Sequence, residues 1–246
     1  MFCYQCQETA KNTGCTKQGV CGKDATLAKE LDNLVFECQE LSTLNHHLRS
    51  HNQDDLQTSR LITNALFTTI TNTNFDVESV KTKIQYLRDK KHELKTRAHE
   101  NHIPLHNLKL TFLPPILGQS SILEEQDQDL RSLKQLIIYG LKGVSAYARH
   151  AQRLGYEDNT LYSNLEEALS LTRQKETTKD QLISCVKGVG ELGIRAMHLL
   201  DKANTITVGH PENTKVATKV GNRPGILVTG HDLQDLKELL DQTIDK

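Results

Sequence analysis

The 246-residue sequence has almost no net charge, no long apolar run and no basic, apolar leader at its start. Its 30 lysines and arginines nearly balance its 31 aspartates and glutamates, which leaves a formal charge of -1. A balanced charge gives no overall field that favours nucleic acid or an anionic membrane. No run approaches the roughly 18 to 20 apolar residues of a membrane span, and cysteines follow almost directly after Met1. These absences predict a soluble, cytoplasmic protein with no nucleic-acid or membrane partner.

Cysteine is present in a pattern that does not suggest disulfides. Four of the six cysteines fall within the first 21 residues, in the arrangement Cys3-x2-Cys6-x8-Cys15-x5-Cys21. Disulfides are rare in the reducing cytoplasm, so clustered cysteines there indicate a metal site. Two thiolates two residues apart can chelate one centre from a single turn, and longer loops carry the other two to its far side.

The residues around these cysteines suit an anionic iron–sulfur cluster. Glycines near the later cysteines let backbone N–H groups approach the sulfurs, and lysines slightly outnumber carboxylates in the loop. The glycines are Gly14, Gly19 and Gly22, and the charged residues are Lys11, Lys17, Lys23, Glu8 and Asp24.

Other uses of the cysteines stay open at this point. Structural zinc sites commonly use two close cysteine pairs, whereas Cys15 and Cys21 are separated by five residues. The spacing also differs from the common ferredoxin runs. It favours iron–sulfur over zinc, with free or oxidised thiols as the third alternative. Cys38 and Cys185 fall within helical patterns and are predicted to be core thiols.

Six segments show apolar residues at helical spacing, which predicts a mainly α protein. They cover about 25–50, 56–70, 77–94, 123–154, 160–173 and 179–202. Short connections between them favour two three-helix bundles. The expected organisation is a cysteine loop (1–24), a first bundle (25–100), a proline-rich connector (101–122) and a second bundle (123–203). His46, His47 and His51 lie close together on or beside the first helix and are expected to be solvated.

The last segment, 204–246, has a different character. Threonine and valine become frequent, and the apolar run Ile226 to Val228 is followed by an amphipathic stretch from Asp232 to about Thr243. This order predicts a strand, a tight turn and a helix, the unit that opens an α/β domain. A parallel strand needs neighbours that the sequence does not supply. We therefore expect the chain to be the front portion of a longer protein, with the α/β domain truncated.

Two separate motifs resemble one known family. Residues Met1 to Ala10, with Gly14-Cys15-Thr16 and Gly19 to Lys23, resemble the N-terminus of the hybrid cluster proteins, also called prismane proteins or hydroxylamine reductases. Leu199 to Thr205, Gly209 to Glu212 and Gly225 to Leu233 resemble the family segment that leads into its first α/β domain, and Leu136 to Ala148 is similar too. Residues 40–122 match only in helical character.

The resemblance implies a cubane [4Fe-4S] cluster on Cys3, Cys6, Cys15 and Cys21, since the short spacing is that of the cubane-bearing members. Members with wider spacing carry a [2Fe-2S] centre instead. The resemblance also implies an N-terminal domain of two three-helix bundles. Two α/β domains then follow and enclose a hybrid iron–sulfur–oxygen cluster, where reduction takes place.

His231 matches the family histidine that ligates the hybrid cluster. It follows the predicted strand and precedes a helix, where open α/β sheets place ligand-binding residues. A helix-capping or surface histidine is the alternative. The family's other hybrid-cluster ligands would lie beyond residue 246. One imidazole cannot hold a multi-iron cluster, so this chain alone is expected to contain no catalytic residues.

Two functions therefore compete. The resemblance implies part of an oxidoreductase that takes electrons from a redox donor and reduces hydroxylamine to ammonia and water, or acts on related nitrogen compounds such as nitric oxide. The alternative is a non-catalytic electron-transfer or metal-binding module made of the helical domain alone. The length of the chain favours the non-catalytic module. The unpartnered strand and His231 favour a truncated oxidoreductase.

Overall fold

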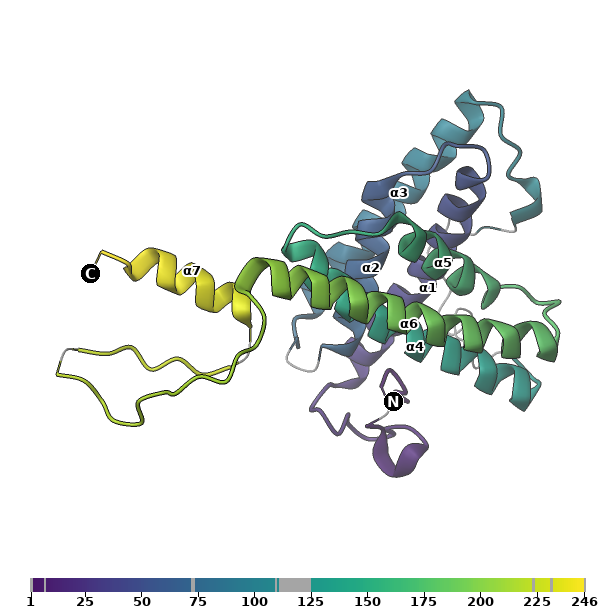
Figure 1. Ribbon diagram of the computed structural model, residues 1–246. Helices are drawn as coiled ribbons and strands as arrows, with labels where there is room; N and C mark the ends of the chain where they lie inside the picture. The colour runs from purple at the N-terminus through teal and green to yellow at the C-terminus, as the bar shows by residue number, and fades with distance from the viewer. Residues whose placement is uncertain are drawn as a thin grey trace.

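Helices make up most of the chain, as predicted. The computed structural model describes residues 2–6, 8–71, 74–108, 110, 125–222, 224–230 and 232–245. Its helices are α1 (Ala25–Arg49), α2 (Leu56–Ile70), α3 (Val77–Glu100), α4 (Gln128–Arg153), α5 (Asn159–Leu171), α6 (Lys179–Val208) and α7 (Leu233–Thr243), with short 3-10 turns at Ala10–Asn12 and His106–Leu108 (Figure 1). The mainly α class is confirmed. None of these helices is both long and apolar enough to cross a bilayer.

Each α-helix begins at a residue whose side chain accepts hydrogen bonds from the first turn. Aspartates cap α1 to α5 and α7, and Thr178 forms a capping box with Gln181 at α6. An N-cap of this kind satisfies N–H groups that have no partner inside the helix, and its negative charge suits the helix dipole. The predicted starts at 25, 56, 77 and 179 agree with those observed, and the one at 160 differs by one residue, whereas α4 begins at Gln128 and not near residue 123.

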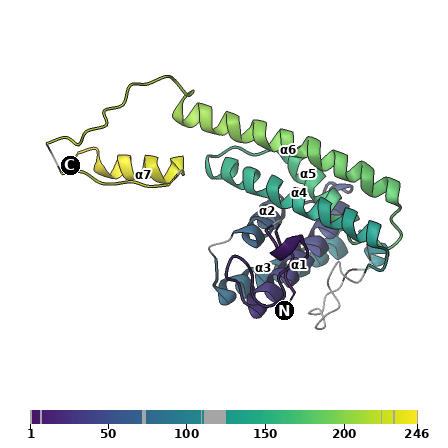
Figure 2. The ribbon, with the colours of Figure 1, turned by 90° about the horizontal axis from the view of Figure 1, so that it is seen from below.

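The first six helices share one hydrophobic core. α1 packs against α2, α3 and α5, α2 packs against α4, and α4 lies along α6 (Figures 1 and 2). Fully buried leucines such as Leu34, Leu41 and Leu66 belong to the same cluster as Leu141 and Leu169. The two predicted trios of helices are therefore in continuous contact. Their division into separate bundles at residues 25–100 and 123–203 stays a prediction.

Buried polar groups also join the two trios. The Glu166 carboxylate of α5 is fully buried. It accepts hydrogen bonds from Asn45 (2.9 Å) and Ser59 (2.5 Å), and it forms an ion pair with Arg49 (3.1 Å). Burial raises the pKa of Glu166, and these donors oppose that effect. Such a network fixes the register of α5 on α1 and α2, because each buried oxygen needs its donor.

α6 is longer than the sequence predicted. The expected end near residue 202 is passed, and the helix continues through Thr205, Ile206 and Thr207 to Gly209, whose φ of 89° ends it. Threonine, valine and isoleucine lower helix propensity by only about 0.5 kcal/mol each, so an established helix can include them. The predicted boundary at residues 203 and 204 thus lies inside a helix.

The C-terminal segment projects away from the bundle. Residues 209–222 and 224–230 are extended and exposed, and α7, which has no buried residue, runs beside them from a point near the end of α6 (Figures 1 and 2). Arg153 of α4 pairs with Asp232 at 3.1 Å and with Asp235 at 3.4 Å. The predicted helix is present as α7.

The predicted strand over 226–228 is absent from the described residues. Leu227 is 94% exposed, and no strand lies beside it in the described part of the chain. A strand exists only when its backbone groups pair with a neighbour, so the apolar run stays extended without one. Most of the predicted connector, 111–122, lies outside the described residues.

Candidate metal centre

Cys3 and Cys15 are held opposite each other by the backbone. The Cys3 N–H donates to the Cys15 carbonyl at 2.9 Å, and the Cys15 N–H donates to the Cys3 carbonyl at 2.8 Å. Residues paired in this way across an antiparallel bridge point their side chains to the same face. Both cysteines are buried and pack on Ala28 of α1. The fold therefore brings together two sulfurs that are twelve residues apart in sequence.

Glycines shape the rest of the loop. Gly14 has a φ of 124° and the Phe2 ring occupies the space of a side chain there, so only glycine suits the position beside Cys15. Gly19 and Lys23 close a tight turn around Cys21, with the Gly19 N–H donating to the Lys23 carbonyl at 2.8 Å. A Cβ on Gly19 would lie 3.1 Å from the Cys21 sulfur. The backbone at Gly19 thus lies close to this sulfur, in line with the role expected of glycines in the loop.

Burial shapes the electrostatics of the thiols. It raises the pKa of Cys3, an effect opposed by a hydrogen bond from the Gln5 backbone N–H and increased by Asp32, Cys15 and Cys21. Burial also lowers the pKa of Lys142 in α4 to about 8, although Asp32, Cys3 and Cys6 oppose that change. Burial raises the pKa of Asp32 to about 6. A carboxylate, a lysine and thiols thus share one poorly solvated region.

The donor chemistry of the four cysteines fits an iron–sulfur cluster. All four are free thiols, Cys3 and Cys15 buried and Cys6 and Cys21 half-buried. Within the described residues, no three His, Cys, Asp or Glu side chains converge tightly enough to ligate one metal ion. Four thiolates are the ligand set of a cubane, which takes one thiolate for each of its irons.

The lysines that give the cysteine loop its predicted excess of positive charge do not all lie near the cysteines. Lys11 and Lys17 are exposed, while Lys23 is buried and donates to the Thr71 carbonyl at 3.1 Å. The buried cation beside the thiols is Lys142, which sequence spacing did not single out. Its signal in the sequence is weak: Gln135, Tyr139 and Lys142 follow one another at intervals of four and three residues and so lie on one face of α4.

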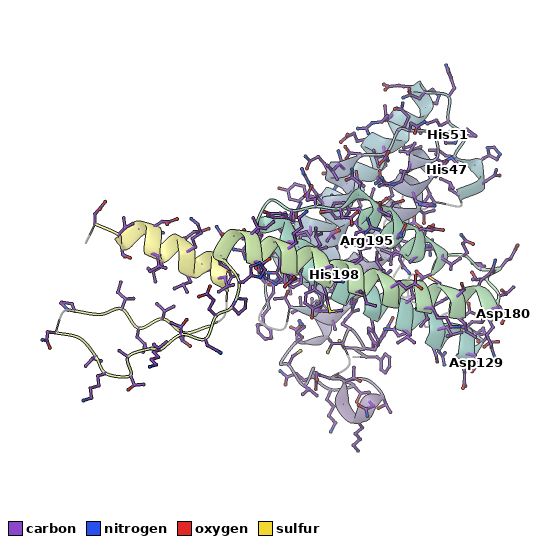
Figure 3. The ribbon with its side chains drawn as sticks, in the orientation of Figure 1. His47, His51, Asp129, Asp180, Arg195 and His198 are labelled. Carbon is purple, nitrogen blue, oxygen red and sulfur yellow. The ribbon has the colours of Figure 1, made fainter. Side chains whose placement is uncertain are left out.

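Cys38 and Cys185 differ in their surroundings. Cys38 is fully buried in the core, as predicted, and burial strongly raises its pKa. Cys185 is half-buried and lines a cavity of about 880 Å³, together with His46, Glu167, Arg195 and His198. Arg195 and His198 lie one turn apart on α6 (Figure 3). Cys185 is therefore less enclosed than a core thiol.

The expectation of solvated histidines holds for one of the three. His51 is exposed, but His46 and His47 are half-buried. Nε2 of His47 lies 3.0 Å from the Pro104 carbonyl oxygen, and its ring contacts that of His51 near the end of α1 (Figure 3). Burial lowers the pKa of His46, whose Nδ1 has no hydrogen-bond partner among the residues that the structure describes. His231 lies outside the described residues.

Comparison with known proteins then decides the family. A model of the Prismane/CO dehydrogenase family matches residues 1–246. The chain belongs to this family. Similar Prismane-family relatives are the proteins named hydroxylamine reductase from Caldanaerobacter subterraneus subsp. tengcongensis (43% identical) and Parabacteroides distasonis (41% identical), each matched over 99% of this chain. The relative from Porphyromonas gingivalis is 43% identical over the same share. The chain spans 46% of the length of each of these relatives.

Proposed function

We propose that this chain is the N-terminal part of a hydroxylamine reductase and that Cys3, Cys6, Cys15 and Cys21 hold a [4Fe-4S] cluster. The observation that carries the proposal is the family match over the whole chain, which includes the four-cysteine loop. The names of the relatives support the reaction class. The exposed apolar run around Leu227 supports a larger protein, because such a run favours burial against further chain.

The cluster would supply one-electron transfer to a hybrid iron–sulfur–oxygen cluster that His231 helps to ligate in the complete protein. The reaction consumes two electrons and two protons, breaks the N–O bond of hydroxylamine and releases ammonia and water. A redox donor has to supply the electrons, and nitric oxide is an alternative substrate of the same class. Localisation in the cytoplasm is part of this proposal, because it keeps the thiols reduced.

The residues of this chain have defined tasks in such a protein. The backbone bridge orients the Cys3 and Cys15 thiolates toward one side, and the Gly19 turn leaves room beside the Cys21 sulfur. Packing on Ala28 limits water at the two buried sulfurs. Low water access and hydrogen bonds to sulfur are the means by which a protein sets the potential of a cluster.

Activity measurements on two lengths of protein test the proposal. The 246-residue chain, reconstituted anaerobically, should take up a redox-active cluster but should not reduce hydroxylamine. The complete protein should reduce it, and His231→Ala should abolish turnover and disturb the hybrid cluster while sparing the [4Fe-4S] cluster. His51→Ala, a change at an exposed histidine, serves as the matched control. Turnover by the short chain, or an undisturbed hybrid cluster in His231→Ala, contradicts the assignment.

A further inference from the structure

Three side chains of α4 reach the short chain segment between Cys3 and Cys6. The Tyr139 hydroxyl donates to the Tyr4 carbonyl, and Gln135 Nε2 lies 3.4 Å from the same oxygen. Lys142 Nζ donates to the next carbonyl, that of Gln5, at 2.9 Å, and to Gln5 Oε1 at 2.5 Å. Both carbonyls between the two cysteines are therefore bound by one face of α4.

Binding these carbonyls also fixes the N–H groups. The described peptide bonds are trans, so the carbonyl of one residue and the N–H of the next point in opposite directions. When Tyr139 holds the Tyr4 carbonyl, the Gln5 N–H is aimed away from it, and this N–H donates to the Cys3 sulfur. Tyr139 thus acts on the Cys3 sulfur through one peptide plane.

Lys142 adds a buried positive charge to the same place. Its side chain is 2% exposed, and its charge interacts with Asp32, Cys3 and Cys6. Gln5 Nε2 donates to Asp32 of α1, so Gln5 links the lysine to the carboxylate. A cation in a region of low dielectric stabilises negative charge nearby far more than it would in water. Reduction adds one negative charge to a cluster, so a buried cation favours the reduced form.

We propose that Tyr139 and Lys142 are positioning residues for the cluster site, which raise its reduction potential by aiming the Gln5 N–H at the Cys3 sulfur and by placing an ammonium beside the Cys3 to Cys6 segment. This inference rests on the proposed [4Fe-4S] cluster. It assigns a function to α4, which contributes no cysteine to the site.

Redox titration of the reconstituted chain tests the inference. At the midpoint potential of the parent chain, Lys142→Met should lower the ratio of reduced to oxidised cluster at least tenfold, which is about 59 mV for a one-electron couple. Tyr139→Phe, a milder change, should lower the ratio at least threefold. Iron content is measured on every sample, so that a shift in potential is not confused with loss of the cluster.

Lys134→Met is the matched control. Lys134 is also a buried lysine of α4, but it pairs with Glu125 at 2.8 Å and with the Gln174 carbonyl at 3.1 Å, and neither is part of the cysteine loop. Its loss should reduce stability and leave the midpoint unchanged.

The outcomes separate the inference from the proposed function. A cluster that binds normally, with the same midpoint in Lys142→Met and Tyr139→Phe as in Lys134→Met, overturns the inference and leaves the proposed function in place. A parent chain that takes up no iron and sulfide overturns both. If Lys142→Met does not fold, Tyr139→Phe decides, because it retains the aromatic ring and removes only the hydroxyl.

Discussion

Cys3 and Cys15 exchange two backbone hydrogen bonds and so turn their sulfurs to the same side of the N-terminal loop. This pairing is the feature of the fold that joins the first half of the cysteine motif to the second. It depends on Gly14, which precedes Cys15 with a φ of 124° and leaves space for the Phe2 ring. The geometry of the loop therefore depends on the backbone conformation at Gly14 and on the bridge between Cys3 and Cys15.

Gly14→Ala should weaken the loop. A side chain at this position both strains the backbone, which costs about 1–3 kcal/mol, and overlaps the Phe2 ring. The variant should retain the helical bundle and bind less iron, as measured by circular dichroism and iron analysis. Gly143→Ala in α4 is the control, since nothing lies within 4 Å of its added Cβ. That change should raise helix stability by about 1 kcal/mol. Equal iron content in both variants would count against the structural role of Gly14.

Lys91→Met should destabilise the bundle. The Lys91 ammonium is buried away from solvent and lies 2.8 Å from Glu37 and 3.7 Å from Glu40. Lys91→Met leaves these two buried carboxylates with one cation fewer. Arg88 still pairs with Glu37 at 2.7 Å and Arg173 with Glu40 at 2.6 Å, so the expected loss is smaller than the roughly 3–5 kcal/mol of a buried ion that loses its whole partner. Urea unfolding measures the loss. Lys81→Met, which removes a largely exposed lysine of the same helix, should leave the midpoint essentially unchanged. Similar midpoints for the two variants would refute the role of the buried pair.

Acid should weaken the contact between Glu157 and Arg60, which joins the α4 to α5 loop to α2. The hydrogen bond and charge of Arg60 hold the pKa of Glu157 below its ordinary value. Because the folded pKa lies below the unfolded value of about 4.3, the pair stabilises the fold above that pH, and its contribution is lost as the pH falls through the folded pKa. Glu157→Gln should be less stable than the parent chain at pH 7, and the difference should vanish in acid. Thermal unfolding at several pH values provides the comparison, and a constant difference across pH would show that the carboxylate is not responsible.

Substitution of the cysteines should separate ligands from core thiols. Cys15→Ser or Cys21→Ser should lose at least half of the iron after anaerobic reconstitution, since a cubane takes one thiolate for each of about four irons. Cys38→Ser should retain the cluster, because Cys38 is fully enclosed by the core, although its buried hydroxyl should lower stability by about 1–3 kcal/mol. Equal iron retention in all three variants would remove the basis for the ligand assignment.

Local signals in the sequence predicted much of this fold. The bounds of α2, Leu56–Ile70, agree with the apolar stripe through Leu61, Ile62 and Leu66, and Asp55 provides the cap. The end of α6 was misplaced because β-branched residues around Ile206 lower helix propensity without breaking a helix. The strand at Leu227 failed for a different reason, since pairing depends on chain that is not adjacent in sequence.

The four cysteines of the motif could also be predicted from the sequence, but the residues that surround them in the fold could not. Cys3, Cys6, Cys15 and Cys21 stand out by residue type and spacing alone. Lys142 reaches Gln5 across 137 residues, a contact that no local pattern encodes. His46 was expected in solvent, yet it is half-buried and lines a cavity together with residues of α5 and α6, which are distant in sequence.

The central claim is that the four N-terminal cysteines hold a four-iron cluster, and elemental analysis tests it most directly. Anaerobically reconstituted chain should contain about four irons and about four acid-labile sulfides per molecule, with no stoichiometric zinc. The dithionite-reduced sample should show the paramagnetic signal of a reduced cluster. One zinc per chain without sulfide would instead identify a structural zinc site and contradict the account.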